Sequence, residues 1–110
     1  MSGVTRASVR PGAAVGMLPG IWRSTLCWDD ASMLCHFLMK PGSRVPLHSH
    51  AAAQNGYCVR GRVRFLLTDG DFNVGPGDAY LFAGGQVHGS EVLEESELIE
   101  VFTPMRPEYT

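Results

Sequence analysis

The sequence predicts an all-β fold, a sandwich or barrel of about eight short strands. Three observations favour it. Thirteen glycines and seven prolines recur along the chain in pairs such as "RPG", "LPG", "KPG" and "GPG". The runs between them are short and rich in β-branched, aromatic and aliphatic residues, and turn signals return every 8 to 12 residues or so. No segment has a convincing helical period.

Each predicted strand is a run of this type bounded by turn residues. In chain order the runs are 21–28, 32–39, 44–50, 56–67, 72–74, 78–82, 87–93 and 97–102. Pro41 and Pro46 fall at strand starts or edges, where a missing N–H does least harm. We expect "LEESE" (93–97) to be a solvated turn, residues 1–15 to form a loose N-terminal arm, and residues 16–110 to form the single domain.

Composition limits the function classes. A chain of 110 residues has room for one modest core. Its 45% hydrophobic and 18% charged residues are typical of a soluble globular protein. The net charge of −2, without a basic patch, argues against nucleic acid, and no apolar run is long enough to span a membrane. The N-terminus lacks the apolar core of a signal peptide, so we expect a cytoplasmic protein whose three cysteines stay reduced.

Three histidines and a glutamine form a candidate metal site. His48 and His50 are two residues apart, which on a strand places them on one face, and Gln54 keeps the same parity if the backbone stays extended. His88 lies in a separate strand-like segment behind "AGGQV". A His-x-His pair alone is more often two surface histidines, so the wider pattern decides.

That wider pattern resembles the cupin family. One motif is formed by Gly42, His48, His50, Gln54 and Gly61, and a second by Gly77, Gly84, Gly85 and His88. The departures are glutamine for the usual glutamate, Ala83 for a proline and Val92 for an asparagine. The resemblance implies a single double-stranded β-helix, or jelly-roll barrel, with one divalent transition metal ion held near its mouth by His48, His50, Gln54 and His88.

The ligand set suits nickel, iron, zinc, manganese or copper and does not select among them. Because imidazoles and an amide are neutral, they leave the full double charge on the ion. Oxidative cupins generally keep the glutamate, so Gln54 favours Lewis-acid work on an anionic ligand. The alternative is that Gln54 only hydrogen-bonds beside a histidine site.

The C-terminal strand offers an acid or base. In "LIEVF", the side chains of Leu98, Glu100 and Phe102 share one face. A carboxylate in such a strand is costly unless it is paired or faces a wet cavity. Arg106 follows within reach of the same cavity. The alternative is an edge strand with Glu100 and Arg106 in solvent.

Together, "HSHAAAQ", "PGDAY", "VHG" and "LIEVFTPMRPEY" resemble the small cupins of the KdgF type. That resemblance implies a metal-dependent enzyme that converts cyclic 4,5-unsaturated uronates, from pectin or alginate breakdown, to linear 4-deoxy-5-keto acids. Its catalytic residues would be Glu100, Phe102 and Arg106, acting on a small anionic substrate. Glu100 stands where the family usually has aspartate, and the alanines 51–53 replace polar residues, which leaves the exact substrate open.

Two other functions remain open from the sequence. One is a different metallo-cupin activity, of the dioxygenase or polyketide cyclase type, and the other is a non-catalytic module that binds a small acid or sugar. We expect a homodimer, because an N-terminal strand can cover a partner's exposed sheet edge. Trp22 and Trp28 are expected in the core or a dimer interface.

Three further features are interpreted as structural. We expect His36 to be a hydrogen-bonded sheet residue and Cys58 to be a packed core thiol. Arg60, Arg62 and Arg64 are expected on a solvated face or dimer rim.

Overall fold

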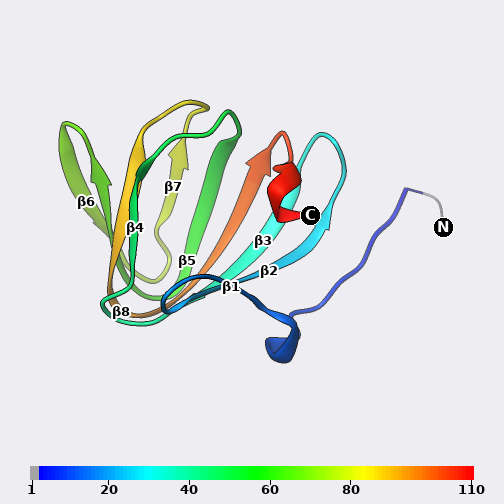
Figure 1. Ribbon diagram of the computed structural model, residues 1–110, viewed down its shortest axis with the longest axis horizontal. Coiled ribbons are helices and arrows are strands. Elements are labelled where there is room, and N and C mark those ends of the chain that lie inside the picture. The colour runs from blue at the N-terminus through cyan, green and yellow to red at the C-terminus, as the bar shows by residue number, and fades with distance from the viewer. Residues whose placement is uncertain (1–2) are drawn as a thin grey trace.

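The computed structural model describes residues 3–110 and confirms an all-β fold (Figure 1). Two 3₁₀ turns flank eight strands. The elements are η1 (Pro11–Ala13), β1 (Val15–Leu18), β2 (Ile21–Trp28), β3 (Met33–Met39), β4 (Arg44–His48), β5 (Ala53–Leu67), β6 (Gly70–Val74), β7 (Ala79–Phe82), β8 (His88–Thr103) and η2 (Pro107–Tyr109).

Two long strands, β5 and β8, connect the layers of the barrel. All pairings are antiparallel, in the order β1-β2-β3-β8-β5-β6, with β4 also on β8 and β7 also on β5. The first part of β8 pairs with β4, and its second part pairs with β3. Each long strand therefore belongs to both layers, which gives the rolled double sheet seen in Figure 1.

A bend at Gly61 makes this possible. The β5–β8 register is irregular between Cys58 and Val63. Gly61 has φ +93°, and a Cβ there would collide with Ser96 and the carbonyl of Glu95. Only glycine fits this corner. Because the register shifts there, even-numbered residues such as Cys58 are buried before the corner and odd-numbered residues such as Val63 are buried after it.

The predicted turn at 93–97 is wrong. These residues continue β8 as a single strand of 16 residues, although residues 93–95 are exposed as expected. Instead of forming a turn, this segment contacts β5 at the corner: the Ser96 hydroxyl accepts a hydrogen bond from the Arg62 N–H (3.0 Å). The exposed charged residues at this bend resemble a loop in the sequence, so the sequence does not reveal that the strand is continuous.

The chain before the sheet is exposed. Residues 3–10 form neither helix nor strand, and pairing with β2 begins at Val15. Residues 1–2 of the predicted arm lie outside the described residues. Over residues 3–110, every helical segment is too short to cross a bilayer.

Candidate active site

The three histidines meet at one end of the barrel. His48 ends β4 and pairs in register with His88, the first residue of β8. His50 lies in the loop after β4, and Gln54 lies on β5. The histidine ring nitrogens that could bind a metal are all within 4.8 Å of one another. Contrary to the prediction from strand parity, the backbone is not extended from His48 to Gln54, and a loop brings them together.

Backbone carbonyls fix the tautomer of each ring. The Nδ1 atoms of His48, His50 and His88 lie 2.8, 2.7 and 2.8 Å from the carbonyl oxygens of Pro46, Ala52 and Gln86. A carbonyl only accepts, so each Nδ1 must carry the proton and donate. Every Nε2 is then left with a lone pair, as a metal ligand requires.

Gln54 adds a fourth lone-pair donor. Its Nε2 donates to Glu100 (2.7 Å), which turns Oε1 toward the rings of His50 and His88, 3.1 Å from each Nε2. With the tautomers above, neither of these short contacts contains a hydrogen. Lone pairs that face one another without a hydrogen between them repel, unless a cation lies where all of them can bind it. Three imidazole nitrogens and one amide oxygen are ligands that suit one divalent metal ion.

Two of the three rings, those of His50 and His88, favour the neutral form. Burial lowers the pKa of His88 to about 4. Burial and the nearby Arg106 guanidinium lower the pKa of His50 as well. Neutral imidazole is the ligand form, so these two rings need not lose a proton to bind a metal at neutral pH.

The alanines that replace the family's polar residues act through their backbone. The Ala52 carbonyl holds His50, as described above, and the His50 carbonyl accepts from the Gly85 N–H (2.8 Å). Gly84 packs so closely on this loop that a Cβ would overlap the Ala51 carbonyl. Polar side chains at 51–53 are thus not needed to orient the histidines.

Glu100 is buried beside the candidate metal ligands. Its side chain is 5% exposed, and its Oε2 accepts hydrogen bonds from Tyr80 Oη (2.5 Å) and Gln54 Nε2 (2.7 Å). Burial raises the pKa of the Glu100 carboxyl, although the two hydrogen bonds and Arg106 act the other way. Among residues 3–110, no side chain is bonded to Oε1, and Glu100 lines the cavity. One oxygen is thus held while the other is free for proton transfer.

Tyr80 depends on Gly56 for its place. The two residues are paired between β5 and β7, and a Cβ at Gly56 would overlap the Tyr80 ring. We expect Gly56→Ala to lower the free energy of unfolding by roughly 2–3 kcal/mol, since the buried ring must move. Urea denaturation measures this, with Gly75→Ala, where the new Cβ meets nothing closer than 3.9 Å, as the control. Equal stabilities for the two variants would contradict the packing described here.

Arg106 forms one wall of the site with two aromatic rings. Its guanidinium lies over Tyr109 (4.1 Å to the centroid) and Phe102 (5.1 Å). Arg23 lies over Tyr109 as well (4.3 Å), so two guanidinium groups hold that ring. Arg106 Nε is buried without a hydrogen-bond partner among residues 3–110. Arg106 also lines the cavity, and a guanidinium group there fits an anionic ligand.

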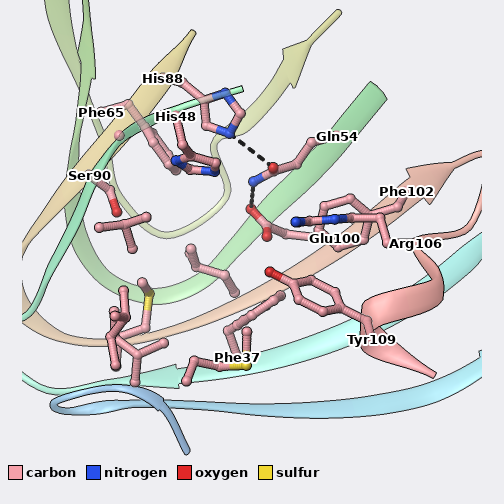
Figure 2. Close-up of a pocket in the computed structure, with 17 residues that line it drawn as sticks. Phe37, His48, Gln54, Phe65, His88, Ser90, Glu100, Phe102, Arg106 and Tyr109 are labelled. Carbon is pink, nitrogen blue, oxygen red and sulfur yellow. Dashed lines mark hydrogen bonds between the residues drawn. The ribbon is translucent and has the colours of Figure 1, made fainter. Parts of the chain in front are cut away.

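A cavity of about 300 Å³ joins these groups. Figure 2 shows His48, His88 and Gln54 at one side of it, with Glu100, Arg106 and Tyr109 around the adjacent wall. The structure thus brings together all the predicted site residues. His50 contacts the others through Gln54 Oε1 but does not line the cavity itself.

The residues interpreted as structural lie elsewhere. His36 is 6% exposed, with its Nε2 2.6 Å from Glu97, and Cys58 is fully buried, so both predictions are confirmed. The arginines 60, 62 and 64 are exposed and form surface ion pairs. Trp22 and Trp28 are 38% and 45% exposed, so neither belongs to the core of the chain.

The sequence of this chain matches a known domain family. The model of the cupin domain matches residues 35–102, which contain every metal-ligand candidate. The chain belongs to the cupin family. Its barrel is the jelly roll that the motifs predict.

Among its relatives, this cupin resembles KdgF proteins. It is 30% identical over 92 residues to "Pectin degradation protein KdgF" of Dickeya dadantii (strain 3937), covering 82% of this chain and 84% of that protein. The structure of KdgF from Halomonas sp. superposes with a TM-score of 0.83 at 27% identity, covering 88% and 92% of the two chains. An RmlC-like cupin from Shewanella frigidimarina (TM-score 0.84, 19% identity, 96% and 100% covered) shares the fold.

Sequence reasoning missed three residues of the site. Tyr80 holds Glu100, Tyr109 supports Arg106, and Ser90 lines the cavity. Tyr80 and Phe82 alternate with exposed residues on β7, a pattern that predicts burial but not a contact with Glu100. For Tyr109 the sequence gives no signal, because η2 folds back onto the barrel after Pro104.

Proposed function

We propose that this cupin is a metal-dependent enzyme that opens the ring of cyclic 4,5-unsaturated uronates to give linear 4-deoxy-5-keto acids. Its similarity to KdgF proteins, one of them named for pectin degradation, supports this substrate class. The observation that carries the proposal is the buried Glu100, bonded to Gln54 on one side and open to the cavity on the other.

The reaction is an isomerisation, with no oxidant and no added water. The anomeric hydroxyl loses its proton, the C1–O5 bond breaks to leave an aldehyde at C1, and the C4=C5 enolate takes a proton at C4 to become a 5-ketone. A metal ion at the three histidines and Gln54 would supply Lewis-acid stabilisation of charge on oxygen.

Glu100 moves the proton. Its free Oε1 takes the hydrogen of the anomeric hydroxyl and returns it to C4, so the carboxyl ends the cycle as it began. Tyr80 and Gln54 hold the other oxygen and thereby fix the direction of Oε1. The raised pKa of Glu100 makes it a better base than a solvated carboxylate.

Arg106 and Phe102 orient the ring. The guanidinium of Arg106, which lines the cavity, pairs with the sugar carboxylate, and the edge of the sugar packs beside Phe102. The carboxylate then lies on the Arg106 side of the cavity, which turns C1 and C4 toward Glu100.

The test is a spectroscopic assay. The conjugated double bond of an unsaturated uronate absorbs in the ultraviolet, and we expect metal-loaded protein to accelerate its loss over the spontaneous rate. Absence of acceleration across the candidate divalent metals would reject the proposal.

Arg106→Lys tests the carboxylate contact. Lysine keeps the charge but loses the planar fork and the stacking on Tyr109, so we expect KM to rise by roughly 10- to 100-fold with a smaller change in kcat. The assay above, run over a range of substrate concentrations, separates the two constants. Arg62→Lys on the exposed face of β5 serves as the control, and an unchanged KM in Arg106→Lys would remove this role.

Gln54→Glu tests why a neutral ligand stands there. The new carboxylate would bind the metal more tightly, by at least about tenfold, because it adds charge. It would also lose the N–H that holds Glu100 and repel it at hydrogen-bond distance, so turnover falls. Titration calorimetry with the metal and the ultraviolet assay measure the two effects. Gln86→Glu, which adds the same charge at an exposed residue, is the control.

A further inference from the structure

The cavity extends beyond the groups that the proposed reaction uses. Along β8 the inward-facing residues run from Phe102 through Glu100 to Leu98, away from Arg106. Leu98 on β8 pairs with Phe37 on β3, and Met39, two residues further along β3, pairs with Ile21 on β2. All four of these apolar side chains line the same cavity. We call this end the apolar lobe, and it comprises Ile21, Phe37, Met39, Val45, Ser90 and Leu98.

Ser90 places a polar side chain in the apolar lobe. Ser90 is 4% exposed and lines the cavity, and it pairs with Val45 on β4 and Phe65 on β5. Its hydroxyl forms no hydrogen bond with residues 3–110 and opens into the cavity. Figure 2 shows Ser90 and Phe65 on the side opposite Arg106 and Tyr109. The hydroxyl is open to the cavity, not sealed against protein atoms, so a ligand atom that accepts a hydrogen bond can reach it.

We propose that the substrate carries a small O-acyl group, such as an acetyl ester, and that the apolar lobe binds it. This inference rests on the proposed function and names the substrate more closely. An acyl group combines what the lobe requires: an alkyl part for Ile21 and Met39, and a carbonyl oxygen that accepts from Ser90. An unsubstituted sugar would place hydroxyl groups, or leave water, against part of this apolar surface, which is unfavourable.

The chemistry of the ring agrees with this placement. The carboxylate is attached at C5, and the ring atom farthest from C5 is C2, next to C3. With the carboxylate on Arg106, substituents on O2 or O3 point away from it along the cavity. The acyl group on either oxygen therefore extends toward the lobe, while C1, C4 and the anomeric hydroxyl remain beside Glu100.

The experiment compares two substrates on metal-loaded protein. They are an unsaturated uronate acetylated at O2 or O3 and the same uronate without the ester, each followed by loss of ultraviolet absorbance. We expect kcat/KM for the acetylated substrate to be about tenfold higher, the discrimination typical of a small group in an apolar pocket. Ser90→Ala should reduce this ratio by about fivefold, because the ester carbonyl loses its donor. Ser24→Ala, on β2 and away from the cavity, should leave the ratio unchanged.

Each outcome decides the inference. A ratio of one or below in the wild type, for both positions of the ester, overturns it while leaving the ring-opening activity established. A tenfold ratio that Ser90→Ala does not alter overturns the role of Ser90 and with it the assigned lobe. If neither substrate is consumed, the proposed function has failed, and the inference fails with it.

Discussion

Replacing Glu100 by glutamine is expected to lower the ring-opening rate by a factor of roughly a hundred to ten thousand, the usual contribution of a general acid–base. Glutamine has the same shape and can still bond to Tyr80 and Gln54, so the barrel and the metal ligands should stay in place. It cannot carry a proton from the anomeric hydroxyl to C4. The loss should therefore appear in kcat, with metal binding close to that of the wild type.

The control for this substitution is Glu94→Gln. Glu94 lies on the same strand, is exposed, and has only a surface partner in Arg62 at 3.5 Å. Removing its charge should leave kcat unaltered. Full activity in Glu100→Gln, with normal metal content, would show that another group moves the proton, and Tyr109 would be the next residue to test.

Much of this architecture could be predicted because the sequence signals are local. Glycines mark the turns, and the spacing of His48 and His50 on either side of a strand end is a local property. The parity of Leu98, Glu100 and Phe102 correctly predicted which side chains are buried, since that part of β8 is regular. Short-range geometry determines these features, so a sequence reveals them.

The rest depends on contacts between distant residues. The continuity of β8 through 93–97 follows from its pairing with β5 around Gly61, and no local pattern reports it. Tyr80 meets Glu100 only because β7 and β8 both pair with β5. Tyr109 reaches the cavity because its carbonyl accepts from Thr25 (2.7 Å), a residue 84 positions away.

Removing the metal, or one of its ligands, is expected to have the second large effect. Stripped protein should lose activity entirely and regain it when a suitable divalent ion is added. His88→Ala should weaken metal binding by at least about 100-fold, because a ligand is lost, and losing a residue that only orients a ligand already costs about 10- to 100-fold. Titration calorimetry and metal content after dialysis measure this. His36→Ala, another buried histidine but one paired with Glu97 outside the site, is the control.

His88→Ala should also change the stability of the protein, in one way when metal is bound and in another, without metal, in acid. A metal ion at about 100 times its Kd adds roughly 2.7 kcal/mol to the free energy of unfolding of the wild type, worth on the order of 10 °C in Tm for a domain of this size, and should add little to His88→Ala.

Without metal, we expect the wild type to lose stability in acid relative to His88→Ala. The pKa of His88 is lowered to about 4 in the folded protein, so between its unfolded value of 6.5 and 4 only the unfolded chain takes up this proton. Stability of the stripped wild type should therefore fall as pH decreases through that window, relative to His88→Ala, which has no imidazole there to protonate. The raised pKa of Glu100 has the opposite effect, since it favours the folded state as pH falls. Glu100 is present in both proteins, so comparing them removes its contribution.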